Sequence, residues 1–557
     1  MSSSSSNTMN IITITLPQFD LKKEKIHTNY VRQIGLPETI IEGLICANCE
    51  YNNYWKILTP LSKPFDIIYI KQWNKRTEII NDVPILKLPN ATDLASINKN
   101  TKLIWSQLPI KVISSSQIVE SWRGQFKYQQ EDSTLGIKGL RPPQLGALYA
   151  IASKFTLKKD FTPLTVILPT GTGKTETMLA TVISQQCSKV LVVVPSDSLR
   201  QQIYKKFLTL GCLADLGVIP KTINYPSVLL LKHGLKTENE AIEIIEASNV
   251  IIATASILNH SSQTAKAKLF ELCTHLFIDE AHHVAASTWN NIRQNFKDKR
   301  VVQFTATPFR NDGKDLGGKI IFNYSLGEAQ EDGYFKTISL QPVKEYLTEQ
   351  ADIAIANKAI ETLRLDISRN YDHLVMARVN DKSRAEELIH IYEAIAPEFN
   401  PILVHSGLSP SQNSQKLEQL ETRHSRIVIC VDMLGEGYDL PNLKIAAIHD
   451  QHKSLAITLQ FIGRFTRTAS NMQIGNASAI ANIADVEIQG GLQKLYAQDA
   501  NWDKIIKRLS EERILNEIKL QDVVNSLRGN GALDKQISLW NLCLLYTSPS
   551  PRDVEES

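Results

Sequence analysis

Short runs of valine, isoleucine and leucine alternate with helix-length segments through the middle of the chain. The runs LTVILP, KVLVVVP, NVIIATA, HLFID and VVQFTAT follow one another between residues 164 and 307. After the glycine- and aspartate-rich segment NDGKDLGG, the pattern returns in DHLVMARV, NPILVHS, RIVICVD and KIAAIHD. Continuous apolar strands separated by helices are typical of parallel sheets with both faces covered. We therefore predict an α/β protein with two such domains in tandem.

The length of 557 residues fits three or four domains. We predict an N-terminal α/β accessory domain of unknown role over 1–115, α/β domains over 116–335 and 336–480, and the start of a helical domain over 481–542. Residues 543–557 begin with CLLYTSPSPRD, which a common transposase-type sequencing adapter can encode. We expect this tail to be an artefact and the natural chain to continue past 542.

Composition excludes several classes of protein. The net charge of +3 is too small to indicate nucleic-acid binding by itself. The seven cysteines are scattered and suggest a reducing compartment, and the single CxxC at Cys46 and Cys49 lacks the second pair of a structural zinc site. No apolar stretch is long enough to cross a bilayer, and no secretory signal is present. We expect a cytoplasmic protein.

The segment LTVILPTGTGKTETMLATVI reads as strand, glycine loop and helix. Gly171 and Gly173 allow backbone amides to approach phosphate oxygens, and the helix presents its positive N-terminus to the same anion. Lys174 supplies a cation and Thr175 a hydroxyl for Mg²⁺, although Leu168 stands where this loop usually has its first glycine. The predicted ATP-binding residues here are Thr170, Gly171, Thr172, Gly173, Lys174 and Thr175.

Two adjacent carboxylates end a second apolar run about a hundred residues later, in LFIDEAHHVA. In a sheet that binds phosphate, one carboxylate at a strand end can hold Mg²⁺ while its neighbour orients and deprotonates the attacking water. We assign Mg²⁺ to Asp279 and the general base to Glu280.

These segments, together with FTATPFR, VDMLGEGYDLP and QFIGRFTR, resemble in type and order the motifs of superfamily 2 helicases and translocases of the DEAH-box kind. The resemblance covers Leu140 to Thr468 and looks closest to the bacterial restriction-subunit and phage-defence group. It implies two RecA-like domains that hydrolyse ATP between them and move along nucleic acid.

The resemblance also implies roles in the first domain. Gln144 would read the adenine edge with Arg141 nearby, although the prolines between them also suit an ordinary helix start. Pro195, Ser196, Arg200 and Thr254 would contact nucleic acid, although these segments could equally be strand-to-helix caps. The residues expected to couple the two sites are His282, Thr305 and Thr307.

In the second domain, His405, Ser406 and Gly407 would contact the nucleic-acid backbone, and Gly435 and Asp439 would face the nucleotide. In a helix Gln460, Arg464 and Arg467 share one face. Arginines without acidic partners suit a triphosphate, whereas a solvated basic helix is the alternative. We expect all three to act in catalysis.

We therefore predict an ATP- and Mg²⁺-dependent helicase or translocase that acts on nucleic acid, DNA rather than RNA. A role in prokaryotic restriction or phage defence, with a partner subunit, is the expected setting. One alternative is the motor subunit of a nuclease; Asp66 precedes IYIK, but Tyr69 stands where a nuclease needs an acidic residue. A second alternative is a nucleic-acid sensor that ATP switches without translocation.

Overall fold

The computed structural model places most of the chain between Ile11 and Asn482. The described residues are 11–46, 49–51, 53–59, 65–72, 83–88, 96–109, 111–157, 159–169, 171–280, 292, 294–306, 318–324, 326–334, 338–405, 407–431, 440, 442–450 and 475–482. The predicted helical segment 481–542 lies almost entirely outside this part of the chain, and the adapter-like tail lies wholly outside it. The domain boundaries stay predictions.

The first large sheet contains the apolar runs of the first predicted α/β domain. Among the described residues it has nine strands in the order β15-β9-β14-β13-β10-β12-β11-β3-β2. The strands from β15 to β11 are parallel, as predicted. Their bounds are β9 Leu164–Ile167, β10 Val190–Val194, β11 Ser227–Leu230, β12 Val250–Thr254, β13 His275–Asp279, β14 Arg300–Thr305 and β15 Lys319–Asn323.

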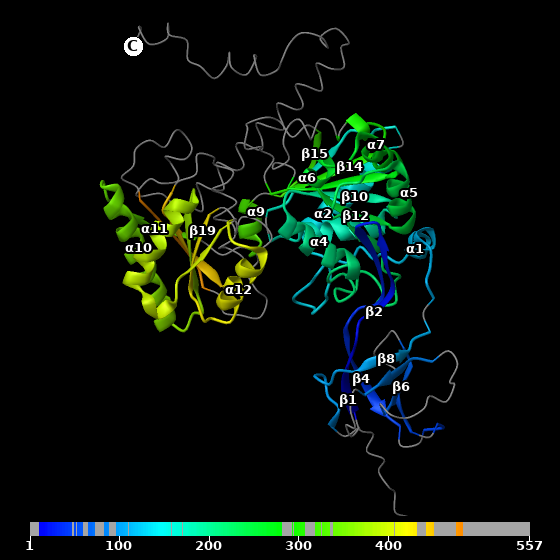
Figure 1. The fold of residues 1–557 in the computed structure, drawn as a ribbon. Coiled ribbons are helices and arrows are strands. Elements are labelled where there is room, and N and C mark those ends of the chain that lie inside the picture. The colour runs from blue at the N-terminus through cyan, green and yellow to red at the C-terminus, as the bar shows by residue number, and fades with distance from the viewer. Residues whose placement is uncertain are drawn as a thin grey trace, which may run out of the picture.

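Helices cover both faces of this sheet (Figure 1). Alternate residues of β10 point to opposite faces, so Val192 belongs to one core and Val193 to the other. The first core also takes in α2, α3 and α4, and the second takes in α5 and α7. The helices are α2 Pro142–Phe155, α3 Lys174–Ser184, α4 Asp197–Thr209, α5 Glu238–Ala247, α6 Ala255–Asn259, α7 Gln263–Leu272 and α9 Leu326–Glu331.

The N-terminal region contributes to two sheets. Strands β2 Phe19–Ile26 and β3 Asn29–Leu36 form a hairpin that joins the edge of the first sheet, because β3 pairs antiparallel with β11. The other strands build a separate six-stranded sheet, β1-β4-β5-β6-β7-β8, among the described residues. They are β1 Ile11–Leu16, β4 Thr39–Ile45, β5 Tyr54–Leu58, β6 Ile67–Lys71, β7 Ile85–Lys87 and β8 Ile104–Gln107.

Among the described residues before Ser114 the regular elements are strands, and the predicted α/β accessory domain stays a prediction. Helix α1, Ser115–Ser121, follows and begins with a capping box formed by Ser114 and Gln117.

The third sheet is parallel throughout its described strands, in the order β16-β21-β20-β17-β19-β18. Its core joins α10 and α11 to the central strands. The strands are β16 Ile338–Val343, β17 Leu374–Val379, β18 Ile402–Val404, β19 Ile427–Val431, β20 Leu443–Ile448 and β21 Ala477–Asn482. The helices are α10 Thr348–Ser368, α11 Lys382–Ile395, η3 Pro397–Phe399 and α12 Pro410–Glu421.

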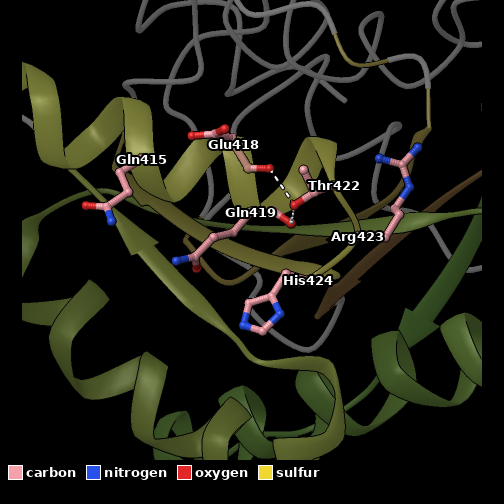
Figure 2. Close-up of a pocket in the computed structure, with 6 residues that line it drawn as sticks. All are labelled: Gln415, Glu418, Gln419, Thr422, Arg423 and His424. Atoms are coloured by element: carbon pink, nitrogen blue, oxygen red, sulfur yellow. Dashed lines mark hydrogen bonds between the residues drawn. The ribbon is translucent and has the colours of Figure 1, made fainter.

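A shallow, polar hollow lies at the end of α12, where Thr422 donates to the carbonyl of Glu418 (Figure 2). No helix among the described residues is long and apolar enough to cross a membrane.

Candidate ATP site and nucleic-acid face

The strands of the first sheet end along one edge, and the predicted site residues follow these ends. The register places Ile167 opposite Thr305, Asp279 opposite Phe304, and Val194 opposite Thr254. In parallel α/β sheets, ligands bind beyond this edge. The glycine loop, the paired carboxylates and the predicted nucleic-acid segments therefore share one side of the domain.

The glycine loop has the conformation that its sequence predicts. Gly171 and Gly173 have φ angles of 95° and 96°, a region that other residues rarely adopt. Gly173 is the N-cap of α3, and a Cβ atom added to it would lie 2.0 Å from Nε2 of Gln144. Backbone geometry and close packing both require glycine here, and the positive end of α3 faces the loop.

Arg141 and Gln144 hold the loop from α2. Arg141 Nη1 donates to the carbonyl of Gly171 (2.9 Å), and Gln144 Nε2 donates to the carbonyl of Gly173 (3.1 Å). The guanidinium of Arg141 also lies 4.9 Å from the ring centroid of Tyr334. The helix-start alternative holds too, because α2 begins with Pro142 directly after Arg141. A contact of Gln144 with adenine stays a prediction.

The centre of the site is an ion pair between Lys174 and Glu280, which join the start of α3 to the end of β13. Both residues are buried, with exposed fractions of 8% and 6%. The second carboxylate oxygen of Glu280 accepts from the backbone N–H of Ala306 (3.3 Å). Glu280 has a φ of 48°, a strained backbone for this residue type. A triphosphate that binds Lys174 must therefore compete with Glu280.

Asp279 and Thr175 offer oxygen ligands of the kind that Mg²⁺ prefers. Asp279 is buried at the end of β13, and Thr175 is half-buried in the first turn of α3. These residues fit the assigned role.

Thr305, expected to couple the two sites, is the buried last residue of β14. Its carbonyl accepts from the backbone N–H of Leu168 (2.9 Å), directly before the glycine loop. Thr172 stabilises the loop further by donating its hydroxyl to the carbonyl of Pro169 (2.7 Å). A shift at the end of β14 would therefore displace the phosphate loop.

The predicted nucleic-acid residues of the first domain act mainly as structural caps in this state. The hydroxyls of Ser196 and Thr254 accept from backbone N–H groups and begin α4 and α6. Arg200 is 4% exposed and donates to the carbonyl of Leu231 (2.6 Å) and to Asp197 (3.0 Å). Its guanidinium is turned into the domain, so a contact with nucleic acid, which stays a prediction, requires this side chain to move.

The second domain brings His405 and Gly407 together with a cation that the sequence analysis missed. His405 Nδ1 accepts from the N–H of Gly407 (3.0 Å). A Cβ atom on Gly407 would lie 3.2 Å from Nζ of Lys382. Lys382 opens α11, where the helix dipole disfavours a cation. That unfavourable position was the local signal that could have singled out Lys382.

Other predicted residues lie outside the described part of the chain, and their roles stay predictions. They are Thr170, His282, Thr307, Ser406, Gly435, Asp439, Gln460, Arg464 and Arg467.

The N-terminal sheet shows the surroundings of Tyr69. Its hydroxyl donates to Glu50 (2.6 Å), and Lys56 contacts the same carboxylate (3.0 Å). These two hydrogen bonds hold the pKa of Glu50 at about 2. Within the described residues, no group of three or more histidine, cysteine, aspartate or glutamate side chains is arranged to hold a metal ion.

Comparison with known families matches both α/β domains. Residues 137–310 match the family described as type III restriction enzyme, res subunit. Residues 356–469 match the helicase conserved C-terminal domain. The two matched regions are the domain pair of the superfamily 2 helicases, and the chain resembles the restriction subunits among them. The predicted pair of RecA-like domains is confirmed.

Individual relatives are distant. The chain is 23% identical to putative helicase 22 of Sulfolobus islandicus filamentous virus, over 61% of this chain and 64% of the relative. It is 22% identical to the ATP-dependent RNA helicase DBP3 of Saccharomyces cerevisiae, over 66% of this chain and 69% of the relative. The chain therefore spans about two thirds of the length of these relatives.

Solved structures are similarly remote. The type ISP restriction-modification enzyme LlaBIII bound to DNA has a TM-score of 0.46 and 16% identity, over 70% of this chain and 31% of that chain. Dbp5 of S. cerevisiae bound to RNA and ADP BeF3 has a TM-score of 0.41 and 16% identity, over 67% of this chain and 97% of that chain. The family assignment depends on the two family models instead.

Proposed function

We propose that this protein hydrolyses ATP and uses the energy to move along nucleic acid. The observation that carries the proposal is the buried pair of Lys174 and Glu280 beside a glycine loop of the correct conformation. A buried ion pair costs folding free energy, because both charges lose their hydration. Such a pair is therefore expected where the charges have a functional use. Here each charge has a separate use once a nucleotide enters.

The chain's own groups divide the work. The amides of Gly171 and Gly173 and the start of α3 would bind the phosphates. Lys174 would turn to the β- and γ-phosphates, which frees the Glu280 carboxylate. Glu280 would then orient a water molecule and take its proton as the water attacks the γ-phosphorus and ADP leaves. Mg²⁺, held by Asp279 and Thr175, would neutralise charge on the phosphates.

The second domain would complete catalysis. We propose that Arg464 and Arg467 reach the same triphosphate, so that hydrolysis requires both domains. Closure that assembles a catalytic site in this way couples ATP turnover to movement. Lys382 and the loop of His405 and Gly407 would grip phosphates of the strand, which gives affinity without sequence preference.

We further propose DNA as the track and restriction or phage defence as the setting, in a prokaryotic cytoplasm and with a partner subunit. The match of residues 137–310 to the restriction-subunit family supports this choice. The relatives also include an RNA helicase, so both polymers belong in the test.

The test is ATP hydrolysis by the full chain alone and with single-stranded DNA, duplex DNA or RNA. We expect one polymer to stimulate ATP hydrolysis. The Glu280→Gln substitution should lower the rate of hydrolysis by a factor of about 10² or more. Because Glu280→Gln removes the charge that competes for Lys174, this variant should bind ATP at least as tightly as the wild type. Weaker ATP binding by the variant would contradict the proposed exchange.

Glu271→Gln is the matched control, since Glu271 lies on the surface of α7 and pairs only with Lys268 among the described residues. It should hydrolyse ATP at the wild-type rate. A protein that binds no ATP would overturn the assignment of the site.

A further inference from the structure

The turn of the β2–β3 hairpin lies on the same side of the first sheet as the carboxyl ends of its parallel strands, where the predicted nucleic-acid segments also lie. Tyr30 is opposite Leu230, the last residue of β11, and Leu230 is in turn opposite Ile252, two residues before Thr254. The hairpin turn at residues 27 and 28 therefore continues the row of strand ends beyond Thr254. Figure 1 shows the dark blue hairpin reaching this domain from the N-terminal sheet.

The hairpin also fixes the loop that follows β11. The side-chain oxygen of Asn29, a fully buried residue, accepts from the backbone N–H groups of Lys232 (2.9 Å) and His233 (3.4 Å). On the other side, Arg200 donates to the carbonyl of Leu231 (2.6 Å). The loop is thus clamped between the hairpin and α4, while the side chains of Lys232 and His233 stay exposed.

The exposed side chains around this clamp combine cations with an aromatic ring. Lys25 pairs with Tyr30 across the hairpin, which places both on one face. Tyr30 is 38% exposed, and Nζ of Lys232 lies 6.0 Å from its ring centroid. We call Lys25, Tyr30, Lys232 and His233 the hairpin patch.

The neighbouring carboxylates already have nitrogen donors as partners. Glu24 contacts Lys22 (2.6 Å), and Glu243 contacts His27 (3.3 Å). Asp197 is engaged by Arg200. The cations of the hairpin patch therefore keep their charge available to an anion.

We propose that the hairpin patch binds the nucleic-acid strand where it passes beyond Thr254, an inference that rests on the proposed function. Lys25 and Lys232 contact phosphates, and the ring of Tyr30 supplies a flat face for a base. Three strand spacings separate β12 from β2, so the patch lengthens the track by about 14 Å.

Lysines on an edge strand can also serve only to block aggregation. That role would explain the charges of β2, but it does not require an exposed tyrosine or a clamped loop after β11. Their joint presence at the predicted track favours binding.

The experiment measures the affinity of Lys25→Ala/Lys232→Ala for a fluorescent single-stranded oligonucleotide over a range of salt concentrations. Log K falls as log salt rises, and each lost phosphate contact makes this negative slope shallower by about 0.7 for a single strand. We expect the magnitude of the slope to be about 1.4 smaller for the double variant than for the wild type. Tyr30→Ala should weaken binding several-fold without changing the slope.

The control is Lys22→Ala/Lys268→Ala, which removes the same charge from the opposite face of β2 and from α7. It should bind as the wild type does. An equal loss in both double variants, or an unchanged slope in Lys25→Ala/Lys232→Ala, would overturn the hairpin inference and leave the proposed function standing. A wild-type protein that binds no oligonucleotide would overturn both. Circular dichroism melting of each variant separates lost binding from lost folding.

Discussion

At the scale of single residues, Gly173 gives the sharpest test of the phosphate loop. Gly173→Ala must place a Cβ atom 2.0 Å from Gln144 at a φ of 96°. Such backbone strain costs about 1–3 kcal/mol, and the loop should move to relieve it. We expect ATP binding to weaken at least tenfold, as measured by titration with a fluorescent ATP analogue.

Gly124→Ala is the matched control. Gly124 also has a positive φ, 70°, but an added Cβ atom there meets no atom within 4 Å. This variant should lose a little stability and keep its ATP affinity. Equal ATP affinity in Gly173→Ala and Gly124→Ala would show that the loop does not depend on the observed packing.

Single residues also show what a sequence can predict. The glycines, Lys174 and Glu280 were identified because the phosphate loop and the strand-end carboxylates have local signatures. The contact between Lys174 and Glu280 spans 106 positions, and no local pattern specifies it. Arg200 was predicted to contact nucleic acid, yet its side chain is buried and donates to the carbonyl of Leu231, a contact that no local pattern specifies.

At the scale of elements, β13 carries a pH-sensitive residue at the edge opposite the site. Burial, with a smaller contribution from Arg300, lowers the pKa of His275 to about 4. The histidine of the unfolded chain has a pKa near 6.5. Between pH 6.5 and pH 4 the unfolded chain therefore binds more protons than the folded chain. The free energy of unfolding falls by up to about 3 kcal/mol as the pH falls through this range.

His275→Gln should flatten this part of the pH dependence, measured by urea unfolding at several pH values. His390→Gln is the control, because the side chain of His390 is 80% exposed. Identical pH profiles for His275→Gln and the wild type would refute the role given to burial.

Elements differ in how well their sequence predicts them. The parallel strands were predicted because both faces are buried and each run is continuously apolar, as in VLVVV of β10. The β2–β3 hairpin was assigned to a separate domain, because nothing in its local sequence, FDLKKEKI in β2 and NYVRQIGL in β3, reveals that β3 pairs with β11 almost 200 residues later. Long-range pairing is decided by packing, which a local pattern does not contain.

At the scale of the whole molecule, the proposed motor has two parallel sheets, and each places candidate phosphate-binding groups at strand ends. The first sheet carries the glycine loop and its ion pair, and the second carries Lys382 beside His405. The net charge of +3 shows that binding to nucleic acid must come from such local groups and not from the overall charge.

Movement of the protein along nucleic acid is tested by ATP-driven displacement of streptavidin from biotinylated DNA and RNA. We predict that the wild type displaces streptavidin from one end of one polymer, and that Glu280→Gln, with ATP bound, does not. Displacement by the wild type would establish a motor and name its track. If a polymer stimulates ATP hydrolysis but streptavidin leaves neither end of any strand, the protein is an ATP-driven switch and does not move along nucleic acid.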